Sequence, residues 1–159
     1  MEYREYQKLN AIKLAGIFVN RRVACDASET GTGKTYTAFC VARLVNADYL
    51  IVIAPKSVRS TWESLALEAG IPLTSYTYEY LRLQARYKAV TFTPHTLVVF
   101  DEAHKCGGRK TLQSQMLAWY AVNARTVLLL SATLACTPLR LGEIGRALGL
   151  YKSTGDHWR

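Results

Sequence analysis

The fold is decided by residues 28–35, which read Ser-Glu-Thr-Gly-Thr-Gly-Lys-Thr. A loop that binds phosphate needs backbone N–H groups aimed at oxygens, small residues for close approach, and one cation. Gly31 and Gly33 meet the first two needs, and Lys34 is the cation. A short apolar strand precedes the stretch, and an apolar helix over residues 35–42 follows it. The stretch therefore predicts a triphosphate-binding loop.

The side chains of this loop suit a nucleotide with its metal. Lys34 would bridge the β- and γ-phosphates, and the Thr35 hydroxyl would ligate Mg²⁺. The strict pattern for such loops places glycine at position 28, where this chain has Ser28. A glycine turn without a ligand is the alternative interpretation. It would not need a Lys-Thr pair opening a buried helix directly after a strand.

A pair of carboxylates, Asp101 and Glu102, follows the apolar run 96–100. One carboxylate can hold Mg²⁺ through water, and the other can act as general base for an attacking water. Adjacent strand residues point to opposite sides, so two roles in one site require the strand to end there. A solvated surface pair is the alternative, which the preceding buried strand disfavours.

Strand-like and helix-like segments alternate along the chain. Leu9, Ile12, Gly16 and Val19 recur at helical spacing and predict the first helix. The expected strands are 23–25, 49–54, 73–77, 96–100 and 126–130. The expected helices are 5–20, 35–42, 58–69, 78–87, 112–119 and a last one opened by Thr137-Pro138. Ser57 is expected to cap the helix over residues 58–69. This order predicts an α/β fold, a mostly parallel sheet with helices on both faces, in one domain over residues 1–159.

The composition favours a polyanionic partner. The formal net charge is +8 and the pI is near 9.5. Such a balance points first to nucleic acid and second to an anionic membrane surface, although basic soluble proteins show it as well. The four cysteines form no CxxC pair, which argues against a metal site and for a reducing compartment. The charged N-terminus and short apolar runs predict no signal peptide, no membrane span and a cytoplasmic protein.

These motifs, in this order, resemble those of the first RecA-like domain of superfamily 2 helicases and translocases. Glu5-Tyr6-Gln7 is similar to the glutamine motif, residues 28–35 to motif I, and 53–58 to motif Ia. Asp101-Glu102-Ala103-His104 has the form of motif II, and Ser131-Ala132-Thr133 that of motif III. The superfamily tolerates a residue other than glycine at the first position of motif I, as with Ser28 here.

The resemblance implies ATP and Mg²⁺ as cofactors and nucleic acid, DNA more than RNA, as partner. It implies catalytic roles for Lys34, Asp101 and Glu102, and Thr35 with Asp101 at the metal. His104, Ser131 and Thr133 would couple hydrolysis to movement, and Pro55, Lys56 and Ser57 would touch nucleic acid. The implied nucleotide-binding residues are Gln7, which would read adenine, with Ser28, Glu29, Thr30, Gly31, Thr32, Gly33, Lys34 and Thr35.

The family pattern is mixed in one respect and shortened in another. The Ia segment is closest to the chromatin-remodeller-type branch, whereas Ser-Ala-Thr is typical of DEAD-box members. This blend resembles the short, divergent helicases of phages or mobile elements. The superfamily's active site lies between two RecA-like domains, and the second contributes arginine fingers. The sequence stops shortly after motif III, so we expect the second domain to come from a longer chain or from another chain. We also expect slow hydrolysis of ATP without it.

Two other readings compete with a helicase motor. One is another P-loop motor, such as a phage packaging ATPase, and the other is a solitary RecA-like module that regulates a partner. Further basic or aromatic surfaces for nucleic acid are also candidates, with packing and solvation as the alternatives. They are Tyr76 and Tyr78 with Arg82, and the loop with Lys105, Arg109 and Lys110.

Overall fold

The computed structural model describes residues 1–133, 138–150 and 152. Cys136 and Thr137, which the sequence analysis singled out, lie outside the described residues. Within those residues, no helix has the length and apolar character needed to cross a bilayer.

The centre of the molecule is a five-stranded sheet in which every neighbouring pair runs parallel. The strands are β1 (Val23–Asp26), β2 (Tyr49–Ile53), β3 (Leu73–Tyr76), β4 (Thr96–Asp101) and β5 (Thr126–Leu130). Their order is β1-β5-β4-β2-β3. The apolar runs are continuous because helices cover both faces of the sheet. The predicted parallel sheet is confirmed, with every strand within about two residues of its expected bounds.

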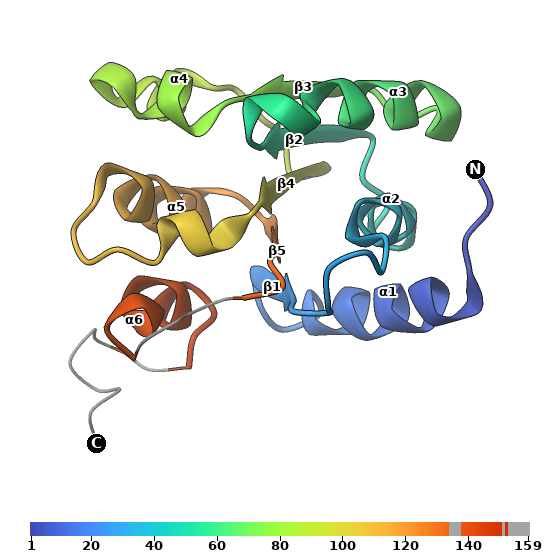
Figure 1. Ribbon diagram of the computed structural model, residues 1–159, viewed down its shortest axis with the longest axis horizontal. Coiled ribbons are helices and arrows are strands. Elements are labelled where there is room, and N and C mark those ends of the chain that lie inside the picture. Colours follow the sequence, from blue (N-terminus) through green and yellow to red (C-terminus); the bar gives the residue numbers. More distant parts are fainter. Residues whose placement is uncertain (134–137, 151, 153–159) are drawn as a thin grey trace.

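Helices lie on both sides of this sheet, as Figure 1 shows. One face carries α1 (Glu5–Ile17), α2 (Lys34–Leu44) and α3 (Arg59–Ala69). The other carries α4 (Tyr78–Arg82), η2 (Leu83–Ala89), α5 (Leu112–Asn123) and α6 (Pro138–Ala147). Two short 3₁₀ helices, η1 (Lys56–Val58) and η3 (Ala103–Cys106), follow β2 and β4. Each face of the sheet thus has its own apolar core.

The strand register brings the predicted motifs to one edge of the sheet. Asp26 and Asp101 both pair with Leu130, so the last residues of β1, β5 and β4 lie at one level. Because β5 separates β1 from β4, the Ser131 segment lies between the phosphate loop and Asp101. Ligands of open parallel sheets bind at the carboxyl ends of the strands, and this is that edge.

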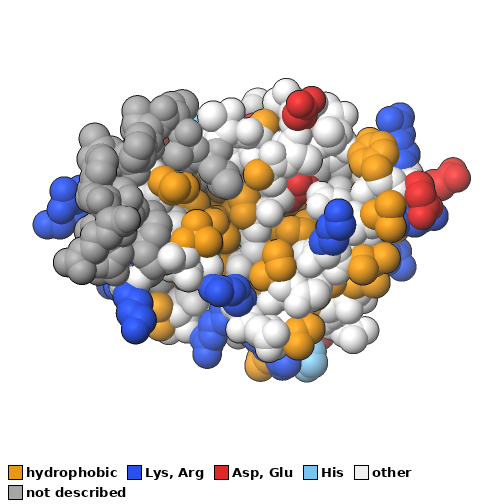
Figure 2. Space-filling model, turned by 90° about the horizontal axis from the view of Figure 1, so that it is seen from below, with side chains coloured by type: hydrophobic (Ala, Val, Ile, Leu, Met, Phe, Trp, Pro, Cys, Tyr) orange, Lys and Arg blue, Asp and Glu red, His pale blue; other side chains and the backbone are white. Residues whose placement is uncertain are grey.

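The first helix differs from its prediction in length and in the face that it buries. It ends at Ile17 rather than at residue 20. Its buried residues are Gln7, Ala11 and Leu14, whereas the stripe that predicted the helix is exposed: Leu9 by 53%, Ile12 by 58% and Val19 by 80%. Figure 2 views the molecule from the α1 side, and hydrophobic side chains are visible across it. The spacing of apolar residues correctly predicted a helix here, but the face that packs against α2 is not the apolar stripe that predicted it.

Two further local predictions are wrong. Residues 78–87 form no continuous helix, because Gln84 and Ala85 have φ of 51° and 52° and break it after α4. Ser57 does not cap α3, since it lies inside η1 and the N-cap residue, Val58, makes no side-chain cap hydrogen bond.

The two faces of α1 can be separated by a pair of substitutions. Leu14, 3% exposed, lies in the core, so Leu14→Ala should lower the free energy of unfolding by about 2–5 kcal/mol. Leu9→Ala on the exposed stripe should change it by less than about 0.5 kcal/mol. Urea denaturation of both variants measures this difference. Equal losses at the two positions would show that the observed orientation of α1 is wrong.

Candidate functional site

The loop between β1 and α2 is closed by its own polar groups. The Lys34 ammonium donates hydrogen bonds to the carbonyl oxygens of Ser28 and Glu29, at 2.8 and 2.7 Å. The hydroxyls of Ser28 and Thr32 are 2.9 Å apart, and the Thr32 hydroxyl donates to the Glu29 carbonyl at 2.8 Å. Ser28, which replaces the glycine of the strict pattern, therefore braces the loop with its side chain.

A hydrogen bond at the start of the loop and two glycines near its end hold its backbone in place. Asp26, the last residue of β1, accepts the backbone N–H of Ser28 at 3.0 Å. Gly31 and Gly33 adopt φ of 79° and 78°, a conformation that other residues rarely take. Gly33 is the N-cap of α2, so the first turn of that helix, with Lys34 and Thr35, directs free N–H groups at the loop.

Helix α1 holds the loop from the side. Gln7 is only 5% exposed, and its amide nitrogen donates to the Thr32 carbonyl at 3.1 Å. Its amide oxygen accepts the N–H of Arg4 at 3.0 Å, and the Tyr6 hydroxyl also donates to Thr32, at 2.9 Å. Gln7 thus positions the phosphate loop. The reading of adenine by this residue stays a prediction.

The carboxylate pair sits where β4 ends. Asp101 is the last residue of the strand, and Glu102 has φ of 55° in the left-handed region. This conformation is costly for a residue with a side chain, and such residues cluster at functional sites. It removes the strict alternation that would send the two side chains to opposite faces. The expectation that the strand ends at this pair is confirmed.

The pKa of Asp101 is raised, chiefly because burial disfavours the charged carboxylate. Hydrogen bonds from the Trp62 indole and the Glu102 N–H oppose this shift, the neighbouring Glu102 charge adds to it, and the Lys34 ammonium lowers the pKa again. The protein alone therefore leaves the negative charge undercompensated. A cation near Asp101 would supply what is missing.

His104, the last residue of motif II, contacts the segment that follows β5. Its Nδ1 is 3.2 Å from the Ser131 hydroxyl and 3.2 Å from a carboxylate oxygen of Glu102. The Ser131 hydroxyl donates to the Thr133 carbonyl at 3.0 Å, so it can only accept from His104. In this arrangement, the His104 tautomer with its proton on Nδ1 is the one that forms the hydrogen bond. The predicted contact between His104 and Ser131 is present, and Ser131 in turn accepts the Thr133 N–H at 3.3 Å.

The predicted nucleic-acid segment lies beside this edge. Pro55 follows β2, and Lys56 and Ser57 are exposed in η1. Of the further candidates, Lys105 lies over the Tyr78 ring at 5.8 Å, and Arg109 and Lys110 are exposed.

Two residues at the site were not recognised as such from the sequence. In the sequence, Trp62 has no predicted role at the site, and Tyr78 is only a candidate nucleic-acid contact. Tyr78 is 1% exposed, which supports the packing alternative over a nucleic-acid contact, and its hydroxyl donates to the Asp101 carbonyl oxygen at 2.6 Å. The Trp62 indole N–H donates to the Asp101 carboxylate at 2.9 Å. The sequence could have indicated these two residues in only one way: each has a hydrogen-bond donor on a side chain whose spacing predicts burial, and such a donor needs an acceptor.

Comparisons with known proteins support the fold. No family model matches the chain. A protein of Acanthamoeba polyphaga mimivirus, provisionally described as an ATP-dependent RNA helicase, is 26% identical over an alignment of 163 residues that covers 81% of this chain and 30% of that protein. The SWI2/SNF2 ATPase core of Sulfolobus solfataricus in complex with dsDNA has a TM-score of 0.80 at 19% identity, covering 99% of this chain and 38% of that one.

A second solved structure gives the same result. The Hef helicase domain of Pyrococcus furiosus has a TM-score of 0.61 at 20% identity, over 92% of this chain and 36% of its own. The chain therefore has the RecA-like fold of these ATPase and helicase domains, which confirms the predicted fold. It spans about a third of the length of the proteins it matches.

The contact between Gln7 and the loop can be tested with two glycine substitutions. A Cβ at Gly33 would clash with the Gln7 amide nitrogen, whereas one at Gly31 would meet nothing within 4 Å. Both positions have nearly the same φ, so both alanines carry a similar strain, about 1–2 kcal/mol. Gly33→Ala should lower the thermal midpoint more than Gly31→Ala does. Equal midpoints in the absence of nucleotide would refute a tight Gln7–loop contact.

Proposed function

We propose that this chain is the ATP-binding first motor domain of a superfamily 2 helicase or translocase. It would couple ATP hydrolysis to movement on nucleic acid, with DNA favoured over RNA. The observation that carries the proposal is the shared edge of β1, β5 and β4, where the phosphate loop, Ser131 and the Asp101-Glu102 pair lie at the carboxyl ends of neighbouring strands. A phosphate loop, a carboxylate pair and a link between them are the parts that an ATP-driven motor requires.

The loop residues are suited to a triphosphate. Phosphate oxygens are stronger acceptors than the two carbonyls that Lys34 now contacts, so the ammonium would exchange them for the β- and γ-phosphates. Gly31 and Gly33 allow the backbone N–H groups of the loop to approach the phosphates closely. The contacts of Gln7 and Tyr6 with Thr32 hold the loop in place for this exchange.

The donor set also fits a hard divalent cation. The Thr35 hydroxyl and the Asp101 carboxylate are oxygen ligands of the kind that Mg²⁺ prefers, and Asp101 carries an undercompensated charge. Mg²⁺ held there would neutralise negative charge that develops on the phosphates. Glu102, exposed and beside Asp101, would accept the proton of the attacking water, and His104 orients its carboxylate.

Nucleic acid would bind beside this edge, at Pro55, Lys56 and Ser57. Lys56 is exposed and provides a cation for a phosphate, and the contact would not depend on base sequence. The connection from His104 through Ser131 to Thr133 would couple nucleotide state to movement. A second RecA-like domain, in the same or another chain, would complete the active site and supply the arginine on which fast turnover depends.

The proposal predicts nucleic-acid-stimulated ATP turnover that needs Lys34 and Glu102. Lys34→Ala and Glu102→Gln should each lower the stimulated rate by on the order of 10²-fold or more. Lys34→Ala should also weaken ATP binding, whereas Glu102→Gln should leave it intact. Phosphate release is measured with the full-length protein and with duplex DNA, single-stranded DNA or RNA.

Lys13→Ala serves as the control for this experiment, because Lys13 is an exposed lysine of α1 away from the loop. Its rate should equal that of the unmodified protein. Turnover that no nucleic acid stimulates would reject the motor and favour a solitary ATP-binding module.

The proposed nucleic-acid contact has its own signature. Lys56→Ala should weaken binding similarly for all base sequences, and the slope of log K against log salt should fall by about one unit. Fluorescence anisotropy with labelled duplexes at several salt concentrations measures both. A loss that depends on base sequence would argue against a phosphate contact at Lys56, and Lys13→Ala again provides the charge-matched control.

A further inference from the structure

Asp101 is held by two buried aromatic side chains from different helices. The Trp62 indole N–H of α3 donates to its Oδ2 at 2.9 Å, and the Tyr78 hydroxyl of α4 donates to its backbone carbonyl at 2.6 Å. Trp62 is fully buried and Tyr78 is 1% exposed. A buried indole N–H or phenol O–H without an acceptor is costly, so both contacts constrain where Asp101 can lie.

These hydrogen bonds fix the orientation of the carboxylate as well as its position. Oδ2 accepts from Trp62, and Oδ1 accepts the backbone N–H of Glu102 at 2.9 Å. Each carboxylate oxygen has a second lone pair, which remains for a cation or its water. Rotation of the carboxylate would break both bonds. Trp62 and Glu102 therefore decide which way the remaining lone pairs point.

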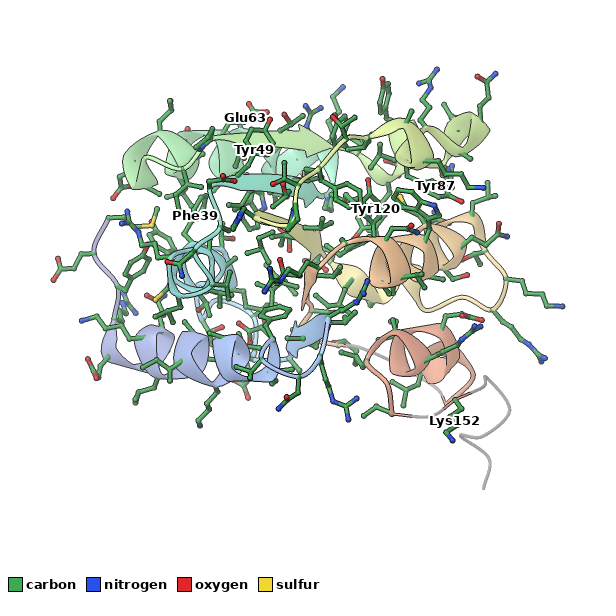
Figure 3. All side chains as sticks on the ribbon, turned by 180° about the vertical axis from the view of Figure 1, so that it is seen from behind. Phe39, Tyr49, Glu63, Tyr87, Tyr120 and Lys152 are labelled. Carbon is green, nitrogen blue, oxygen red and sulfur yellow. The ribbon has the colours of Figure 1, made fainter. Side chains whose placement is uncertain are left out.

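Trp62 also contacts the helix that follows the phosphate loop. Its ring lies 5.6 Å from the ring of Phe39 in α2, with the planes tilted by 42°. Figure 3 shows Phe39 on α2, on the side of the sheet away from α5. Trp62 of α3 thus contacts both Asp101 and α2, and α2 is the helix that begins with Lys34. Helix α3 begins at Arg59, shortly after the predicted nucleic-acid segment of Pro55, Lys56 and Ser57.

We propose that Trp62 and Tyr78 are positioning residues that set Asp101 in the geometry required to hold Mg²⁺. They tie that geometry to α3 and α4, the helices that follow β2 and β3 at the edge where nucleic acid would bind. The inference rests on the proposed function. It is separate from the His104–Ser131 contact. That contact links the segment after β5 to Glu102, whereas Trp62 and Tyr78 link α3 and α4 to Asp101.

The test measures the Mg²⁺ dependence of nucleotide binding rather than turnover. A fluorescent ATP analogue is titrated into the full-length protein with Mg²⁺ varied, and again with EDTA. Trp62→Phe retains a ring and removes the N–H. Partners that orient a metal-binding group typically change metal affinity by about 10–100-fold, so the half-saturating Mg²⁺ concentration should rise by about 10-fold or more. Binding in EDTA should stay within about 2-fold of the unmodified protein.

Matched controls separate positioning from general destabilisation. Trp119→Phe removes an indole that packs on Tyr87, Phe92 and Tyr120, and Tyr120→Phe removes a hydroxyl that donates to the Tyr87 carbonyl at 3.4 Å. Neither should change the Mg²⁺ dependence. Tyr78→Phe should raise the half-saturating concentration in the same direction as Trp62→Phe, and it carries the test if Trp62→Phe does not fold.

A double substitution shows whether the effect passes through the carboxylate. In an Asp101→Asn background, Trp62→Phe should cause no further change in Mg²⁺ dependence. Folded Trp62→Phe and Tyr78→Phe variants that respond to Mg²⁺ like the unmodified protein would overturn the positioning role and leave the proposed function intact. An unmodified protein that binds the analogue without any effect of Mg²⁺ would overturn both.

Discussion

The structure depends on the alignment of three strand ends. Asp26, Leu130 and Asp101 lie in register across β1, β5 and β4, and the polar segments that follow them must therefore lie next to one another. A buried parallel sheet enforces this alignment, because a one-residue slip would turn apolar side chains of each strand to the other face. The phosphate loop, Ser131 and the carboxylate pair are thus brought together by the packing of residues that take no part in binding.

Around this edge, side chains from three helices, α1, α3 and α4, hold the phosphate loop and Asp101 in fixed positions. Gln7 and Tyr6 of α1 fix the loop at Thr32, while Trp62 and Tyr78 fix Asp101. The backbone strain at Glu102 persists because its surroundings determine its position. A site prepared in this way loses little conformational freedom when a ligand binds, which favours binding and catalysis.

The strands and the phosphate loop could be predicted from the local sequence pattern. The wrong predictions arose where that pattern fits more than one structure. Continuous apolar runs such as 126–130 have one stable arrangement in a sheet covered on both faces. Helix α1 has apolar residues on two sides, so its spacing could not decide which side packs on α2. The break at Gln84 and Ala85 carries no glycine or proline, and nothing in the local sequence marks it.

The sequence by itself determined the elements, their order and the chemistry of residues 28–35 and 101–104, because these depend on contacts between near neighbours. Only the tertiary structure decided what holds them. Trp62 and Tyr78 lie 39 and 23 residues before Asp101. Spacing shows that such side chains are buried, but the acceptor that each one reaches depends on strand order and helix packing. For the same reason Gln7 holds Thr32, a contact that chain folding alone creates.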